Sequence, residues 1–251
     1  MKPLRSLAIA LQFLTRLPVT VDPCPTPQEM GQSVLFYPAV GALIGALLAA
    51  FSVLASYLGA SSSLSGMLIL SLWVGVTGAL HLDGLADTVD AFAAGKGDRE
   101  RTLQLMKDPH SGPFAVVSLI LVLLLKAAAL TTLDARLAPG FLLLPPLLGR
   151  TALPILFLTT PYVRPGGLGH ALSEHLPRGP VWVVCTMTLA SVLVGFGRPG
   201  IATLAIAAAT ALWLHHRLMV RLRGTTGDTA GALVELVETA TVVTLALVAH
   251  N

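Results

Sequence analysis

One short stretch of this 251-residue chain is dense in polar residues: His81-Leu-Asp-Gly-Leu-Ala-Asp-Thr-Val-Asp90. Its aspartates, Asp83, Asp87 and Asp90, are spaced i, i+4 and i+7, so on a helix their carboxylates lie on one face. Neighbouring carboxylates repel one another unless cations neutralise them, and Mg²⁺ binds carboxylate oxygens together with substrate phosphates. We therefore predict that these three residues bind Mg²⁺ and are catalytic. The alternative is a solvated helix end that happens to be acidic.

The segment that follows supplies cations for bound phosphates. Lys107 and Asp108 precede Pro109, with Gly112 close behind, so a turn should fix them just before the next apolar segment. We predict that Asp108 completes the metal site and that Lys107 is catalytic, because phosphoryl transfer combines metal ions with Lys or Arg on the phosphate oxygens. Further predicted substrate-binding residues are His81, Lys96, Arg99 and His110. The alternative is that the cations are ordinary loop charges of a membrane protein.

Four charged residues fall inside apolar segments: Lys126, Arg150, Glu235 and Glu238. At about 1.5 Å per helical residue, all four lie at similar depths from one membrane face. Charges in lipid are expensive and normally pair inside the bundle or line a wet cavity. We expect one buried cluster in which Arg150 pairs with Glu235 or Glu238. We predict that Arg150 and Glu235 bind substrate, and the alternative is that the cluster only ties helices together.

The last apolar segment opens with Gly224-Thr-Thr-Gly-Asp-Thr-Ala-Gly231. Glycine-rich backbone before a helix N-terminus suits phosphate, so Gly227 and Asp228 are predicted to bind substrate. The stretch lacks the lysine of a P-loop, and an ordinary N-cap at Thr226 or Asp228 explains it almost as well.

Composition sets the fold class that must position these residues. Hydrophobic residues make up 54% of the chain and charged residues only 12%, against about 25% charged in a soluble domain. This balance excludes a disordered chain and predicts an all-α polytopic membrane protein, with residues 1–251 as a single domain. Residues 4–17 are too short to span and are predicted to form an amphipathic helix on the membrane surface or against the bundle. About seven spanning helices are expected, at 34–58, 65–82, 114–133, 139–161, 180–197, 199–218 and 229–249.

The basic residues predict the orientation of these spans. Twelve Lys and Arg fall in segments on the N-terminal side of the membrane and two on the other. The positive-inside rule therefore places the N-terminus and the acidic segment in the cytoplasm and the C-terminus outside. This distribution also explains the net charge of +3, so the lipid bilayer is the expected partner and nucleic acid is not. A homo-oligomer is left open.

Several motifs, taken in order along the chain, are similar to those of one enzyme family. They are Phe13-Leu-Thr-Arg-Leu-Pro18, Phe36-Tyr-Pro-Ala-Val-Gly-Ala-Leu-Ile-Gly45, the 81–90 stretch, Met106-Lys-Asp108, and Thr226-Gly-Asp-Thr-Ala-Gly231 with Glu235. Over nearly its whole length the chain resembles the cobalamin-5′-phosphate synthase family, also called adenosylcobinamide-GDP ribazoletransferases. Two departures are visible: Ala91 stands where the family has Gly, and Pro109-His-Ser-Gly112 replaces Ser-Arg-Ile-Gly. The second removes a cation near the expected phosphate site, so Arg99 or His110 is expected to replace it.

The resemblance implies a Mg²⁺-dependent enzyme of a bacterial inner membrane. The ribose 3′-hydroxyl of α-ribazole, or of its 5′-phosphate, would attack the cobinamide-bound phosphate of adenosylcobinamide-GDP, and GMP would leave. The residues by themselves predict metal-assisted phosphoryl transfer at the cytoplasmic face, whereas the substrates come from the resemblance alone.

Two other functions compete with this interpretation. A membrane prenyltransferase, or another phosphotransferase with an Asp-rich Mg²⁺ site, would use Asp83-x-x-x-Asp87 on a diphosphate. Prenyltransferases show two separated Asp-rich motifs, and the C-terminal Gly-Asp-Thr stretch is no clear second copy. A secondary transporter would relay protons through buried Glu and Arg. It is disfavoured because the sequence shows no inverted repeat and gathers its acids at one membrane face.

Overall fold

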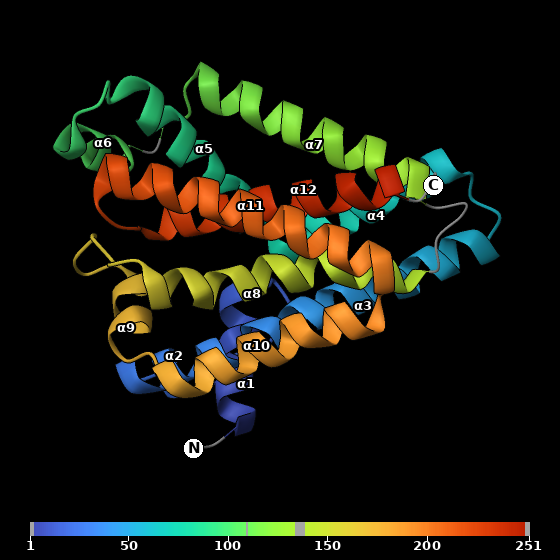
Figure 1. Ribbon diagram of the computed structural model, residues 1–251, viewed down its shortest axis with the longest axis horizontal. Coiled ribbons are helices and arrows are strands. Elements are labelled where there is room, and N and C mark those ends of the chain that lie inside the picture. Colours follow the sequence, from blue (N-terminus) through green and yellow to red (C-terminus); the bar gives the residue numbers. More distant parts are fainter. Residues whose placement is uncertain (1–2, 109, 134–138, 249–251) are drawn as a thin grey trace.

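The computed structural model describes residues 3–108, 110–133 and 139–248. Within these ranges the chain is helical, and its one β-type contact is an isolated bridge between Tyr162 and Thr225. The longest helices run side by side along the long axis of the molecule (Figure 1). In chain order the elements are α1 (Pro3–Leu14), α2 (Pro27–Ser33), η1 (Val34–Phe36), α3 (Tyr37–Tyr57), α4 (Ser62–Thr77), α5 (Leu80–Ala94), α6 (Arg99–Leu105), α7 (Pro113–Leu133), η2 (Pro139–Leu143), α8 (Leu144–Thr159), α9 (Leu168–Glu174), α10 (Arg178–Gly195), α11 (Gly197–Leu222) and α12 (Gly227–Val248).

The predicted all-α polytopic membrane fold is confirmed. Six helical segments of the described chain are long and apolar enough to cross a membrane, and the bent pair of α4 and α5 makes a seventh if it forms one broken span. The six are Pro27–Tyr57, Pro113–Leu133, Pro139–Thr159, Arg178–Gly195, Gly197–Leu222 and Gly227–Val248. Six of the seven ranges expected from sequence coincide with these segments, with ends displaced by a few residues.

The second expected span, 65–82, is wrong at its C-terminal end. α4 stops at Thr77, Gly78 and Ala79 take left-handed backbone angles (φ 60° and 57°), and α5 leaves at 84° to α4. A left-handed residue ends an α-helix because the right-handed turn cannot continue through it. The side chain of Arg16 fills the space beside Gly78 where a Cβ atom would otherwise lie. The acidic stretch therefore belongs to a separate helix, α5, with its own direction.

The amphipathic N-terminal helix packs against the bundle. Figure 1 shows α1 running across the direction of the long helices. Its buried residues, Ser6, Ile9, Ala10 and Leu14, lie on the side that faces α2 and α3. This is one of the two positions predicted for that helix.

Helices α8 and α12 form the centre of the bundle. Both are mostly buried, whereas most of α10 and α11 is exposed, and α12 contacts α5, α7, α8 and α11. The end of the bundle that holds α6 and α9 also holds the C-terminal end of α5 and the first residues of α7 and α12 (Figure 1). We call it the α6/α9 end, and the acidic residues of α5 and α12 lie toward it.

Candidate active site

Helix α5 presents its aspartates on one side and its apolar residues on the other. Asp83 is exposed and Asp87 is half-buried, while His81, Leu85 and Thr88 are buried against the bundle. The buried side contacts α12 closely, because a Cβ atom on Gly84 would lie 2.6 Å from the carbonyl oxygen of Asp228. Only a glycine permits this approach, so the acidic side of α5 is held beside the first turn of α12.

This contact brings the carboxylates of α5 close to Asp228 of α12 and to one arginine. Asp83, Asp228 and Asp90 lie near enough to Asp87 for their charges to act on it, and so does Arg164. Arg164 Nη1 donates a 2.8 Å ion-paired hydrogen bond to Asp228 Oδ2. Asp83, Asp87 and Asp228 therefore form an acidic cluster with a single counter-charge among the described residues.

Asp90, the third predicted metal ligand, is engaged by backbone amides. Its two carboxylate oxygens accept hydrogen bonds from the N–H groups of Gly112 and, at 2.9 Å, Ala115. These amides belong to the start of α7, where the first N–H groups have no partner within the helix. Asp90 therefore caps α7 from a different helix and joins it to α5. Its predicted metal-binding role is untested.

Hydrogen bonds join α11 to the 95–112 segment and to the C-terminal part of α5. Arg99 Nε donates to the Leu222 carbonyl oxygen at 2.7 Å, and Arg221 Nη2 donates to the Phe92 carbonyl oxygen at 2.7 Å. The guanidinium of Arg99 thus caps the C-terminal end of α11, where a cation is favoured by the helix dipole. Lys96 is exposed at the turn before this contact, with a left-handed φ of 46°.

The turn before α7 leaves its polar side chains exposed. Asp108 accepts a 2.7 Å hydrogen bond from the His110 ring and a 3.0 Å bond from the His110 amide. The hydrogen bond from the His110 ring holds the pKa of the Asp108 carboxyl below its usual value. Lys107 is also exposed, and Pro109 lies outside the described residues. Across the described chain, no three Asp, Glu, His or Cys side chains are already arranged to hold a metal ion.

The start of α12 is an N-cap built from threonines. The Thr229 amide donates to Thr226 Oγ1 at 3.3 Å, and the Thr226 amide donates to Thr229 Oγ1 at 2.9 Å. The ordinary cap considered for Thr226 is therefore confirmed. Gly227 is exposed next to it, and its predicted contact with phosphate stays a prediction.

The expected cluster of buried charges is confirmed, and His81 also contacts it. Arg150 pairs with Glu238, while Lys126 Nζ lies 2.5 Å from Glu235 Oε1 and 3.0 Å from Glu238 Oε2. Arg150 Nη2 also lies 3.4 Å from His81 Nδ1, so His81 points into the bundle, away from the acidic side of α5. Because these side chains are at most 5% exposed, they form a desolvated network across α5, α7, α8 and α12. The predicted substrate contacts of Arg150, Glu235 and His81 are untested.

Sequence reasoning missed two members of these groups. Trp73 contacts Lys126, whose Nζ lies 4.3 Å from the centroid of the indole ring. Arg164 had been counted only as a loop charge. Its partner Asp228 is 64 positions away in sequence, so no local spacing indicates the pair. In the sequence, only the surrounding Pro and Gly residues indicated a structured loop.

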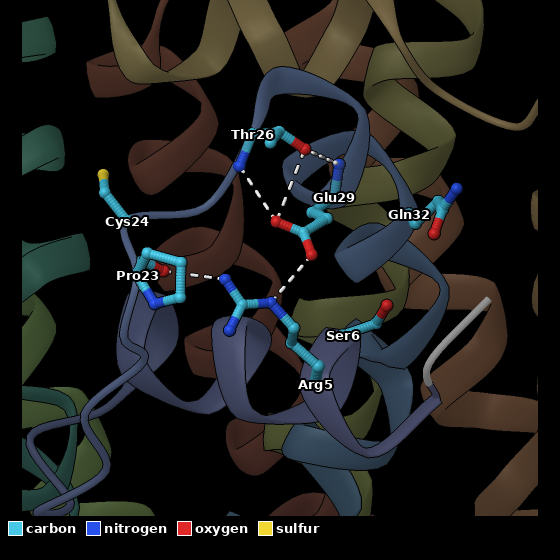
Figure 2. A pocket seen from close by; sticks show the side chains of 7 residues that line it. All are labelled: Arg5, Ser6, Pro23, Cys24, Thr26, Glu29 and Gln32. Carbon is cyan, nitrogen blue, oxygen red and sulfur yellow. Dashed lines mark hydrogen bonds and ion pairs between the residues drawn. The ribbon is translucent and has the colours of Figure 1, made fainter.

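A separate pocket of about 480 Å³ lies between α1, α2 and the segment that joins them. Figure 2 shows Arg5 among the lining residues, with dashed lines to Glu29 and Pro23. Its Nε donates to Glu29 Oε1 at 2.7 Å and its Nη2 donates to the Pro23 carbonyl oxygen at 2.7 Å. Since the charge of Arg5 is already compensated, this pocket offers no free cation for a phosphate.

Comparison with known proteins finds one matching family model and many similar chains. The family model described as cobalamin-5-phosphate synthase matches residues 6–246. A protein of Pseudomonas paraeruginosa (strain DSM 24068 / PA7), named adenosylcobinamide-GDP ribazoletransferase, is 55% identical over 245 residues, covering 97% of this chain and 98% of the relative. A protein of the same name from Pseudomonas entomophila (strain L48) is 57% identical over 242 residues, covering 95% and 97%. No solved structure matches the chain.

Proposed function

Because the chain belongs to the cobalamin-5-phosphate synthase family, we propose that it joins α-ribazole, or its 5′-phosphate, to adenosylcobinamide-GDP. In this reaction the ribose 3′-oxygen forms a bond with the phosphorus attached to cobinamide, the bond from that phosphorus to the GMP oxygen breaks, and GMP leaves. The observation that supports it best is the acidic cluster of Asp83, Asp87 and Asp228 with Arg164 beside it.

The charge and ligand type of the acidic cluster suit a Mg²⁺ ion, and binding would require its carboxylates to move together, since they are not already arranged around a metal position. Three carboxylates and one guanidinium leave an excess of negative charge, and carboxylate oxygens are the ligands that Mg²⁺ prefers. We propose that Asp83 and Asp87 hold the ion, with Asp228 as the third carboxylate in place of the predicted Asp90, whose oxygens are bonded to α7. When bound, Mg²⁺ would supply positive charge to the phosphate oxygens and the leaving group.

The chain's own residues would then bind and orient the substrates. The proton of the attacking hydroxyl would pass to a carboxylate oxygen of Asp83 or Asp87, the two that have no hydrogen bond to another described residue. Lys96 and Lys107 are exposed and are proposed to contact the diphosphate, as predicted. Arg99 and His110 already have protein partners, so substrate contact would require them to exchange those bonds.

The proposed location is a bacterial inner membrane with the α6/α9 end in the cytoplasm. The bent α4–α5 pair, taken as one span, gives seven crossings and puts the two chain ends on opposite sides. A cytoplasmic α6/α9 end agrees with the charge distribution, since Lys96, Arg99 and Lys107 all lie there.

Release of GMP by the purified protein in detergent tests this proposal. With adenosylcobinamide-GDP, α-ribazole and Mg²⁺, Asp83→Asn and Asp87→Asn should each lower turnover by several orders of magnitude, because each removes a charged metal ligand. Asp22→Asn, which removes one exposed carboxylate between α1 and α2, is the matched control and should keep wild-type turnover. Near-normal turnover of Asp83→Asn and Asp87→Asn would contradict the assignment. Uptake of substrate into proteoliposomes without GMP release would favour a transporter instead.

A further inference from the structure

Arg164 is the basic residue that the structure places on the acidic cluster. It lies between α8 and α9, its Nη1 donates to Asp228 Oδ2 at 2.8 Å, and its side chain is 33% exposed. Its charge also acts on Asp87. The guanidinium therefore reaches the cluster from the segment between α8 and α9, which is distant from α5 in sequence.

The backbone around Arg164 is fixed to the start of α12. The Val163 amide donates to the Thr225 carbonyl oxygen at 2.9 Å, and the Thr225 amide donates to the Pro161 carbonyl oxygen at 2.8 Å. The neighbouring Tyr162 ring packs on Gly169, and its burial raises the pKa of the Tyr162 hydroxyl. Two backbone hydrogen bonds and a packed ring hold the three residues that precede Arg164, so the side chain extends from an ordered segment.

Three other basic side chains of this end are bonded elsewhere, whereas Lys96 and Lys107 are exposed. Arg99 and Arg221 donate to the carbonyl oxygens of Leu222 and Phe92, and His110 bonds to Asp108. In the described parts of the chain, Arg164 is the one basic side chain in an ion pair with Asp83, Asp87 or Asp228.

A purely structural role explains Arg164 poorly. An ion pair with one member a third exposed contributes little to folding stability. A guanidinium has five N–H donors, and only the bond to Asp228 joins it to the described side chains and backbone. The remaining donors form the planar fork that recognises phosphate oxygens.

We propose that Arg164 is a substrate-binding residue that holds a phosphate group of the substrate against the acidic cluster. This inference rests on the proposed function, because it takes the acidic cluster as the reaction site. The phosphate is either in the diphosphate of adenosylcobinamide-GDP or in the 5′-phosphate of α-ribazole 5′-phosphate.

Steady-state kinetics of Arg164→Met and Arg164→Lys test the proposal. Loss of a hydrogen bond to a charged group corresponds to roughly a 10- to 100-fold change in binding, so Arg164→Met should raise the KM of the phosphate-bearing substrate by that factor. Arg164→Lys should recover part of the loss, since it restores the charge without the fork. The KM of unphosphorylated α-ribazole should not change. Arg178→Met is the matched control, because Arg178 donates to the Leu158 carbonyl oxygen at 2.5 Å and lies outside the cluster.

The two phosphate sources give different results. A raised KM for adenosylcobinamide-GDP, with α-ribazole as the second substrate, identifies the diphosphate. A raised KM for α-ribazole 5′-phosphate alone identifies the 5′-phosphate. Unchanged KM values for both substrates in Arg164→Met would overturn the proposal, as would equal effects of Arg164→Met and Arg178→Met.

Thermal unfolding gives a second readout that does not depend on turnover. Without substrate, the unfolding midpoint of Arg164→Met should stay within about 2 °C of wild type, while the rise caused by adenosylcobinamide-GDP or α-ribazole 5′-phosphate should be lost. Persistence of both rises at wild-type size would overturn the proposal. If Asp83→Asn and Asp87→Asn keep full turnover while Arg164→Met no longer shows a substrate-induced rise in unfolding midpoint, the proposed metal site is wrong and the phosphate contact of Arg164 stands.

Discussion

Removal of Lys126 is expected to destabilise the protein severely. Its Nζ lies 2.5 Å from Glu235 and 3.0 Å from Glu238, and none of the three side chains is more than 5% exposed. Lys126→Met would leave two buried carboxylates with Arg150 as their only direct cation partner in the described chain. Removing one member of a buried ion pair costs about 3–5 kcal/mol, so the free energy of unfolding should fall by about that amount.

Two double variants test whether stability depends on which ion pair survives or only on the number of buried charges. Lys126→Met with Glu235→Leu leaves Arg150 on Glu238, whereas Lys126→Met with Glu238→Leu leaves Arg150 and Glu235, which share no ion pair in the described chain. The first should recover most of the loss, because replacing a complete buried pair by apolar residues is often neutral or stabilising. The second should remain about 3 kcal/mol less stable than wild type.

Denaturant unfolding of the purified variants in detergent micelles, followed by tryptophan fluorescence, measures these differences; Trp73 lies 4.3 Å from Lys126 Nζ. Equal stabilities of the two double variants would refute the reasoning, since both carry the same charges and differ only in which contact survives. The folded Lys126→Met/Glu235→Leu protein then decides the role of the cluster. Normal GMP release means that the cluster ties helices together, and its loss means that the cluster also holds substrate.

Two further predictions concern α7 and the orientation in the membrane. Asp90→Ala should lower the free energy of unfolding by about 1–2 kcal/mol, because it removes the cap of α7. Asp90→Asn should lower it less, because one acceptor oxygen remains. Denaturant unfolding measures both variants, and a wild-type midpoint for Asp90→Ala would contradict the capping role. In intact cells, a membrane-impermeant maleimide should label Ser63→Cys, introduced in a Cys24→Ser background, and leave Cys24 of the wild type unlabelled; the reverse pattern would show that the α6/α9 end is not cytoplasmic.

The spans were predictable from sequence because each is a local run of apolar residues, and only length and hydropathy decide it. The break between α4 and α5 was not, because Ala79 takes a left-handed conformation (φ 57°) that alanine gives no reason to expect. Gly78 beside it is one of many glycines in the chain. The 84° bend is therefore set by packing, with Arg16 filling the space beside Gly78.

In the candidate site, too, local contacts were predictable from the sequence and distant contacts were not. The shared face of Asp83 and Asp87 follows from their i, i+4 spacing. The capping of α7 by Asp90 joins residues 22 and 25 positions apart, and the pair of Arg164 and Asp228 spans 64 positions. Spacing cannot encode such contacts, because they arise only when separate helices pack. The buried charges were an exception, since desolvation makes pairing nearly obligatory whatever the separation.

These contacts explain how a helix that starts inside the bundle can present an ordered acidic face. At its first turn, His81 lies 3.4 Å from Arg150, which is itself paired with Glu238. In its middle, Gly84 brings the α5 backbone against α12, and near its C-terminal end Asp90 is bonded to α7. The contact of His81 with Arg150 therefore joins the first turn of α5 to the buried ion pairs between α7, α8 and α12. Of the aspartates of α5, Asp83 and Asp87 are then the two whose oxygens stay available to a cation.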